Sequence, residues 1–277
     1  MKTLYVTDLD GTLLSTDSKV SERSAAIISD CVSRGALFTC ATARTPATVE
    51  MLLRHTLTSA PAIVMTGAAT WDLRSHRFIT TKLMSDDTAA RCTEICRRHG
   101  LLPMTYTVTS DERLDVYVHG HPEGPSEKFI ADRQHLKYKR FHILPTAEAP
   151  DFYPRTIIIF VIGEAGVIKA AAEEMNSVEG CTAVPYPDIF NPRVAMIDIY
   201  AAGVSKAEAV IKLKKATGAD RLTVFGDNLN DIPMMQVADC AIAVENALPG
   251  VKAVAHEIIG PNTSDSVARY ILKDFDR

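Results

Sequence analysis

Two aspartates near the N-terminus, Asp8 and Asp10, are the residues whose type and spacing most directly suggest catalysis. They follow the strand-like run Thr3–Thr7, which is rich in β-branched and aromatic residues, and Gly11 comes next. Ligands of open parallel sheets bind at the carboxyl ends of the strands. There, one carboxylate can attack phosphorus and become an acyl phosphate, while the other protonates the leaving oxygen. The Asp-Gly pair could instead form only a tight turn, and a calcium loop fits less well because its glycine would come later.

A threonine follows the second strand-like segment. The run Leu37–Cys40 stops shortly before Thr42, which we expect to donate its hydroxyl and its backbone N–H to an anion at the edge of the sheet. Thr45 is then a candidate N-cap, with Pro46 at the first helical position. Taken alone, a threonine at a strand end is more often structural, so this motif depends on the others.

A lysine lies at the start of a predicted helix. Ser205 and Glu208 have the spacing of a capping box, which begins a helix that extends to about Lys215. Lys206 would lie in the first turn, beside the positive end of the helix dipole, which is unfavourable for a cation by roughly 0.3–1 kcal/mol. A bound anion would reverse the sign of this effect. An exposed lysine is the plainer alternative.

Two more aspartates follow another apolar run. Leu222–Gly226 ends just before Asp227, and we expect Asp231 in the first turn of the next helix. Two carboxylates about 4 Å apart repel each other by roughly 4 kcal/mol at an effective dielectric constant near 20. A site that gathers this pair with Asp8 and Asp10 around a phosphate therefore needs a cation. Oxygen ligands favour Mg²⁺ over zinc or copper.

Together, these four segments resemble the motifs of the haloacid dehalogenase (HAD) superfamily of phosphatases, and within it the Cof-like branch, subfamily IIB, which has the larger, C2-type cap. They stand in the family's order and near its spacing. The matching segments are Asp8–Leu13, Ala41–Arg44, Gly203–Lys206 and Gly226–Asp231. Three positions depart from the usual pattern, since Ala43 and Ser266 stand where the family often has Gly, and Thr66 where it often has Asn.

The resemblance implies a role for each motif residue. It makes Asp8 the nucleophile and Asp10 the general acid and base. It implies that the phosphate is bound by Thr42, Lys206 and Asn230. Mg²⁺ would be held by Asp8, the backbone carbonyl of Asp10 and Asp227, with Asp231 as a direct or water-mediated partner. Arg44, close to Thr42, is a candidate substrate contact.

The resemblance also implies an α/β fold, with a Rossmann-like, doubly wound parallel-sheet core and an inserted α+β cap that sets substrate specificity. An amphipathic helix over Ser21–Arg34 would connect two parallel strands, as a right-handed crossover requires. Ala62–Met65 is predicted to be the next core strand. We expect the core to comprise residues 1–83 and 199–277 and the cap residues 84–198, where the pattern mixes helices and strands without acids at strand ends.

The composition is that of a globular protein, with 47% hydrophobic and 23% charged residues in a chain of 277. A net charge of −4 gives no support for a nucleic-acid partner, and no apolar run reaches the roughly 20 residues of a membrane helix. We therefore expect a cytoplasmic protein without a membrane partner. Cys92, Cys96 and His99 could share a helical face, but no second pair completes a metal site. The basic stretch Lys128–Arg140 is either a solvated face or attracts a phosphorylated metabolite.

The function predicted from the sequence is Mg²⁺-dependent hydrolysis of small phosphorylated metabolites through an aspartyl phosphate, with sugar phosphates the leading class by resemblance. One alternative is a phosphomutase or phosphotransferase of related design, and another is a non-catalytic protein that binds such metabolites. A response-regulator receiver fits poorly because of the long insertion between Thr42 and Lys206. A dinucleotide-binding fold also fits poorly, since no Gly-x-Gly-x-x-Gly follows the first strand. The sequence does not indicate the oligomeric state.

Overall fold

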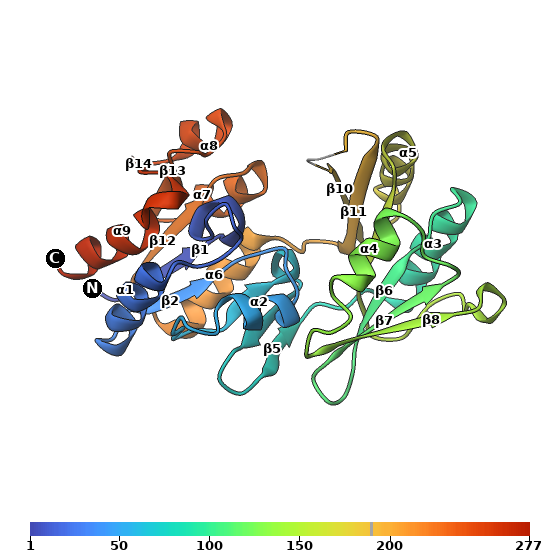
Figure 1. The fold of residues 1–277 in the computed structure, drawn as a ribbon, viewed down its shortest axis with the longest axis horizontal. Coiled ribbons are helices and arrows are strands. Elements are labelled where there is room, and N and C mark those ends of the chain that lie inside the picture. Colours follow the sequence, from blue (N-terminus) through green and yellow to red (C-terminus); the bar gives the residue numbers. More distant parts are fainter. Residues whose placement is uncertain (189–190) are drawn as a thin grey trace. The chain divides into compact units, whose positions relative to one another are not determined.

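The computed structural model describes residues 1–188 and 191–277, which form two compact units (Figure 1). Unit 1 consists of Met1–Thr80 and Ser205–Arg277, and unit 2 of Thr81–Val204. The sequence analysis places the two boundaries at 83/84 and 198/199, a few residues away. Each unit has its own buried core.

Unit 1 is built around a five-stranded parallel sheet in the order β14-β13-β12-β1-β2 (Figure 1). Its strands are β1 (Thr3–Thr7), β2 (Leu37–Cys40), β12 (Arg221–Gly226), β13 (Cys240–Val244) and β14 (Glu257–Ile259). The interior strand β1 pairs with both β12 and β2, and the side chains of Leu4 and Val6 have no exposed surface. Central strands of parallel sheets are buried on both faces, which explains their nearly continuous apolar sequences. The predicted α/β fold with a parallel core sheet is confirmed.

Two groups of helices pack on this sheet. The helices of unit 1 are α1 (Glu22–Ser33), α2 (Pro46–Leu52), α6 (Lys206–Thr217), α7 (Ile232–Gln236), α8 (Pro249–Val254) and α9 (Ser266–Phe275). α1 and α9 pack against each other and against β2 and β1, whereas α6 packs against β1, β3 and α7. Asp265, directly before α9, connects α9 to α1. Its carboxylate accepts hydrogen bonds from the hydroxyl of Ser21 (2.5 Å), just before α1, and from that of Ser24 (2.9 Å), within α1.

The ends of α6 and α2 show how far capping residues could be predicted. The Ser205 hydroxyl accepts a hydrogen bond from the backbone N–H of Glu208 (3.1 Å), so α6 begins at Lys206 as predicted. Thr45 occupies the N-cap position of α2, as predicted, although its side chain makes no capping hydrogen bond. Pro46 takes the first helical position, as predicted.

The segment after α2 forms a small antiparallel sheet in the order β3-β4-β5, with β3 at Ala62–Val64, β4 at Ala69–Asp72 and β5 at Arg77–Thr81. β3 touches the parallel sheet through one isolated bridge, between Ala41 and Ile63, and pairs antiparallel with β4. The prediction that Ala62–Met65 is a full core strand is therefore wrong in part. Met65 lies in a 3-10 turn, Met65–Gly67, where positive φ angles at Met65 and Thr66 end the strand.

The Met65–Gly67 turn packs directly against the start of α6. A Cβ on Gly67 would lie 2.4 Å from the backbone oxygen of Ser205, so only glycine fits there. The Thr66 backbone N–H donates to the carbonyl of Thr42 (3.0 Å), and the Met65 N–H donates to that of Arg44 (3.0 Å). The turn thus joins the Thr42 segment to the helix that carries Lys206.

Thr66 adopts a left-handed conformation (φ 57°, ψ 18°) that is unfavourable for a β-branched residue and well tolerated by asparagine. We expect Thr66→Asn to raise the free energy of unfolding by about 0.5–1 kcal/mol. Urea denaturation, monitored by circular dichroism, measures the change. Thr66→Val, which keeps the branched Cβ, is the matched control and should gain nothing. An asparagine variant that is no more stable than the wild type would contradict this prediction.

Unit 2 contains a six-stranded sheet in the order β10-β11-β9-β6-β7-β8 (Figure 1). Its strands are β6 (Met104–Val108), β7 (Leu114–His119), β8 (Lys139–Leu144), β9 (Thr156–Glu164), β10 (Cys181–Pro187) and β11 (Val194–Ala201). Neighbouring strands pair antiparallel, except for the parallel pair of β7 and β8. This mixed unit corresponds in chain order to the predicted α+β cap.

Helices pack on both faces of the unit 2 sheet. The helices are α3 (Asp86–Arg98), α4 (Pro125–Ala131) and α5 (Ala165–Met175). A Cβ on Gly163 of β9 would contact Ile168 of α5, whereas the ring of Phe160, three residues earlier on the strand, packs against Phe129 of α4. Side chains three residues apart on a strand point to opposite faces, so α5 and α4 cover opposite sides.

The basic stretch Lys128–Arg140 is not a uniformly solvated face. Lys139 is buried, with its ammonium 5.4 Å from the centre of the Phe141 ring, and burial lowers the pKa of its ammonium to about 7. Arg140 donates to the carboxylate of Asp115 (3.0 Å). The interpretation as a solvated face is therefore wrong for Lys139.

Within residues 1–188 and 191–277, none of the helices has the length and apolar character that crossing a membrane requires.

Candidate active site

Asp8 lies at the carboxyl end of β1, an interior strand of the parallel sheet. Its backbone N–H donates to the carbonyl of Phe225 on β12 (3.0 Å), which continues the pairing of the two strands by one residue. Its side chain is buried, and one carboxylate oxygen accepts a hydrogen bond from Nζ of Lys206 (2.6 Å). The sheet therefore fixes the position of the predicted nucleophile.

Lys206, the first residue of α6, is almost completely buried. Its ammonium donates to Asp8 (2.6 Å) and to Asp231 (2.7 Å). The anions that offset its unfavourable place near the helix dipole are thus two carboxylates of the chain itself. An ammonium has three N–H groups, so one remains for a ligand.

Asp231 holds the loop after β12 in place. One of its carboxylate oxygens accepts the Lys206 bond, and the other accepts the backbone N–H groups of Asp227 (3.0 Å) and Asn228 (3.1 Å). It ends the 3-10 turn Leu229–Asp231 and directly precedes α7. A Cβ on Gly226 would lie 2.6 Å from the Cβ of Asp231, so a larger residue would displace it.

Asp227 faces the turn after β1. The Thr12 hydroxyl donates to its carboxylate (2.7 Å), and a Cβ on Gly11 would lie 2.3 Å from the same carboxylate. Gly11 also has a φ of 75°, which side chains rarely adopt. The sequence reasoning missed Thr12 as an orienting residue, although its place inside the Asp8–Leu13 motif was a signal.

The carboxylates of Asp8, Asp227 and Asp231 form a group that could hold a metal ion, since oxygen atoms of all three lie within 4.8 Å of one another. With all groups ionised, the cluster has three negative charges and the one positive charge of Lys206. An all-oxygen donor set with excess negative charge fits a hard divalent cation. The donor chemistry therefore agrees with the predicted metal site.

The environment of Asp8 and Asp227 favours their protonated forms when no metal ion is bound. Burial raises the pKa of Asp8 to about 8, the charge of Asp231 adds to this, and Lys206 opposes it. Burial also raises the pKa of Asp227 to about 6, against the hydrogen bond from Thr12. Burial acts to lower the pKa of the Lys206 ammonium, but the charges of Asp8 and Asp231 outweigh it and hold that pKa above its ordinary value.

Asp10 and Arg44 form a two-pronged ion pair beside this cluster. The Arg44 guanidinium donates through Nε (2.7 Å) and a terminal nitrogen (2.5 Å) to the two carboxylate oxygens of Asp10. Asp10 is exposed, and Arg44 is half-buried. The direction of Arg44, which the sequence left open, is therefore toward Asp10.

The other two predicted phosphate ligands differ in their placement. The Thr42 hydroxyl oxygen accepts the backbone N–H of Arg44 (3.2 Å) and can still donate its hydrogen. The Thr42 backbone N–H donates to Ile63 (3.0 Å), so the prediction that it binds an anion is wrong. Asn230 is exposed, and no hydrogen bond joins it to the acidic cluster in the described part of the chain. Its role as a ligand stays a prediction.

A cluster of carboxylates at the carboxyl edge of a parallel sheet is typical of an α/β enzyme, and comparisons with known proteins give the family. The family of haloacid dehalogenase-like hydrolases matches residues 5–271, so the chain belongs to it. The resemblance stated from the sequence is confirmed, and the protein is a hydrolase of the phosphatase type.

Named relatives cover nearly the whole chain. A 5-amino-6-(5-phospho-D-ribitylamino)uracil phosphatase of Bacillus subtilis is 25% identical over 97% of this chain and 94% of its own. A pyridoxal phosphate phosphatase of Escherichia coli is 25% identical over 95% of both chains. These relatives are phosphatases of different small molecules.

Solved structures share the fold over the same extent. A haloacid dehalogenase-like hydrolase of Bacteroides thetaiotaomicron has a TM-score of 0.80 at 19% identity and covers 99% of this chain and 100% of its own. A HAD subclass IIB sugar phosphatase has a TM-score of 0.74 at 20% identity and covers 100% of this chain and 99% of its own. The fold is thus that of HAD hydrolases.

The acidic cluster predicts a stabilising effect of Mg²⁺ that depends on pH. The raised pKa values of Asp8 (about 8) and Asp227 (about 6) exceed the value near 4 of an unfolded aspartate. The metal-free folded protein therefore binds more protons than the unfolded chain between about pH 4 and 8, and its stability falls as pH rises through that window. Mg²⁺ at about 100 times its dissociation constant at pH 8 should add roughly 2.7 kcal/mol to the free energy of unfolding. The same concentration should add less at pH 5.5, where protons compete for the carboxylates.

Thermal unfolding at both pH values, with Mg²⁺ or with EDTA, measures this effect. Asp227→Asn should reduce the rise in Tm that Mg²⁺ causes, because it removes one charged ligand. Asp17→Asn, a change at an exposed carboxylate outside the cluster, is the control and should keep the full rise. An unreduced rise in the Asp227 variant would show that the ion binds elsewhere.

Proposed function

We propose that this protein is a Mg²⁺-dependent phosphatase that hydrolyses small phosphorylated metabolites through an aspartyl phosphate on Asp8, with sugar phosphates as the leading substrate class. The observation that carries the proposal is the buried Asp8 carboxylate at a strand end, bonded to Lys206 and grouped with Asp227 and Asp231. A structural neighbour named as a sugar phosphatase supports the substrate class.

The first half-reaction would transfer the phosphoryl group to Asp8. The Asp8 oxygen attacks phosphorus in line, the bond from phosphorus to the substrate oxygen breaks, and Asp10 gives its proton to the departing alkoxide. Lys206 orients Asp8 through its 2.6 Å bond and would also contact the phosphate. Thr42 and Asn230 would donate further hydrogen bonds to the phosphate oxygens.

The second half-reaction would release phosphate. Asp10, now ionised, takes a proton from a water molecule that attacks the phosphorus of the aspartyl phosphate, and the bond to Asp8 breaks. Mg²⁺, when bound by Asp8, Asp227, the Asp10 carbonyl and Asp231 directly or through water, would supply charge neutralisation for the phosphoryl group. The carboxylates of Asp8 and Asp10 return to their starting states.

Arg44 would act on both Asp10 and the substrate. The two hydrogen bonds of the bidentate guanidinium hold the Asp10 carboxylate in position for the base step. The acid step needs a protonated Asp10, so the guanidinium would shift to an oxygen of the bound substrate during that step. This assignment makes Arg44 both a substrate contact and a positioning residue.

The first test of the proposal is phosphate release from a panel of phosphorylated compounds, with Mg²⁺ or with EDTA. The panel contains sugar phosphates, pyridoxal phosphate and ribityl phosphates, since the named relatives act on the last two kinds of compound. We expect metal-dependent turnover that Asp8→Asn lowers by about 10³-fold or more, because the nucleophile is lost. Asp17→Asn should keep full activity, and Tm values confirm that both variants fold.

Three outcomes would decide against parts of the proposal. Turnover that survives Asp8→Asn would rule out the aspartyl phosphate. Product isomerisation with a sugar bisphosphate, without phosphate release, would favour the phosphomutase alternative. Binding of a panel compound without turnover would favour the non-catalytic alternative. Action in the cytoplasm stays a prediction.

Replacing Arg44 tests its two contacts. Arg44→Ala should lower kcat/KM by about 10–100-fold, which corresponds to the loss of charged hydrogen bonds worth roughly 1.4–2.7 kcal/mol. Arg44→Lys should retain more of the wild-type kcat/KM than Arg44→Ala but not all of it, because an ammonium cannot form the two-pronged pair. Steady-state kinetics separates the two contacts, since a lost substrate contact raises KM and a misplaced Asp10 lowers kcat. Arg54→Ala, at an exposed arginine that is hydrogen-bonded to His55, is the control. Unchanged kinetics in Arg44→Ala would refute both roles.

A further inference from the structure

Two cysteines of unit 2 that are distant in sequence lie in contact. Cys92, in the middle of α3, and Cys181, the first residue of β10, have sulfur atoms 3.6 Å apart. Both are free thiols. The predicted neighbours of Cys92 as metal ligands were Cys96 and His99, and His99 instead bonds Glu174 (2.9 Å). In the described residues, the only group of three or more side chains with metal-binding geometry is the aspartate cluster, so these thiols are not a metal site.

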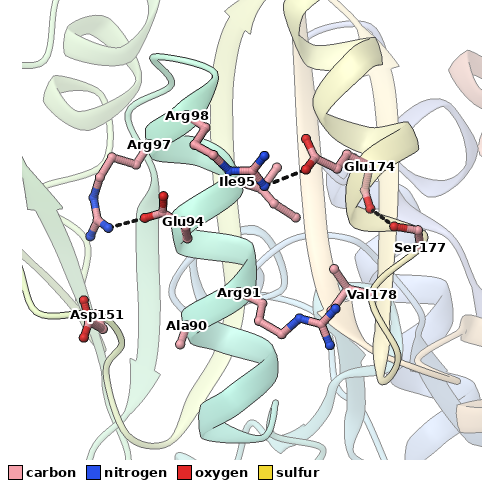
Figure 2. Close-up of a pocket in the computed structure, with 10 residues that line it drawn as sticks. All are labelled: Ala90, Arg91, Glu94, Ile95, Arg97, Arg98, Asp151, Glu174, Ser177 and Val178. Atoms are coloured by element: carbon pink, nitrogen blue, oxygen red, sulfur yellow. Dashed lines mark hydrogen bonds and ion pairs between the residues drawn. The ribbon is translucent and has the colours of Figure 1, made fainter.

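Contacts on either side of Cys92 fix α3 against the segment that leads to Cys181. Toward the start of α3, the Thr88 hydroxyl donates to the carbonyl of Glu179 (3.4 Å). Toward its end, Arg98 donates to Glu174 (2.5 Å), as Figure 2 shows. The same view shows Ile95 and Arg91 of α3 facing the end of α5 and the turn that follows it. The short distance between the two sulfur atoms therefore follows from the packing of two whole elements.

The two thiols differ in their access to solvent and in their chemistry. Cys92 has no exposed surface, whereas Cys181 is partly exposed. The Cys92 S–H donates to the sulfur of Cys181, and this hydrogen bond lowers the pKa of the Cys181 thiol. The thiolate is the reactive form of cysteine. Cys181 thus has the solvent access of an attacking thiol, and its lowered pKa favours the reactive form, while the Cys92 sulfur, 3.6 Å away, is placed to react with it next.

We propose that Cys92 and Cys181 are a redox modification site, at which hydrogen peroxide reacts with Cys181 and Cys92 closes a reversible disulfide. The Cys181 thiolate attacks one peroxide oxygen, the O–O bond breaks, and hydroxide leaves, which gives a sulfenic acid. The Cys92 sulfur then attacks the Cys181 sulfur, the S–O bond breaks, and water leaves with the thiol proton. In total, two thiols and one peroxide give a disulfide and two waters.

The position of Cys181 gives this bond a structural consequence. Cys181 pairs with Ala201, the last residue of β11, and the Ala202 N–H donates to the Gly180 carbonyl (2.8 Å). The chain passes from unit 2 into unit 1 four residues after Ala201. A disulfide would tie α3 covalently to the strand end from which the segment carrying Lys206 continues, and it would constrain the unfolded chain between residues 92 and 181.

Thiol counting on the full-length protein tests the proposal. The native protein is treated with a small excess of hydrogen peroxide, quenched, denatured and alkylated, and its mass is measured. The number of alkylated thiols should fall from six to four, and dithiothreitol should restore six. A peptide map should contain the linked Cys92 and Cys181 peptides, and the Tm of the oxidised protein should rise.

Two variants and the peptide map keep the outcome decisive. Cys181→Ala should retain all five of its remaining thiols after peroxide treatment, whereas Cys96→Ala, one helical turn from Cys92, should still lose two. The map of the wild-type protein decides the matter even where a variant fails to fold. Six alkylated thiols after treatment, a linkage between other cysteines, or Cys181 as an unlinked sulfinic acid would overturn the proposal.

Discussion

The double hydrogen bond of the Lys206 ammonium is the interaction on which the site depends. It connects Asp8 at the end of β1 with Asp231 after β12, and it starts from the first residue of α6. A buried ammonium without partners is strongly unfavourable, and so is a pair of buried carboxylates without a cation. Each of the three side chains therefore offsets the cost of burying the other two. The single ammonium of Lys206 connects segments that are far apart in the sequence.

Most of the core and most of the site could be predicted because their signals are local. Apolar runs that end in Asp8 and Asp227 indicate strand ends, and strand ends of a parallel sheet share one edge. Lys206 stands out in the sequence as a cation placed against a helix dipole, but the sequence alone could not show that Asp8 and Asp231 supply anions beside it.

The features that could not be predicted depend on contacts between distant segments. Arg44 turns toward Asp10, and Thr12 toward Asp227, only because the loops after β1, β2 and β12 meet. The Thr42 N–H is used by the bridge to Ile63, which depends on how far β3 continues beside β2. The substitution at Ala43 has a simpler explanation, since Ala43 does not have the positive φ that would require glycine.

The charge balance of the site explains why such an unfavourable cluster persists. Three carboxylates against one ammonium leave net negative charge in a mostly buried place, and the raised pKa values of Asp8 and Asp227 reflect that cost. A neutral residue in place of one carboxylate, or a second basic residue, would relieve the repulsion and stabilise the fold. Such a change would also weaken the attraction for a divalent cation. The same excess negative charge that destabilises the fold is therefore what attracts a cation to the site. Because the surrounding sheet buries many apolar side chains, the fold can tolerate this local destabilisation where the chemistry needs it.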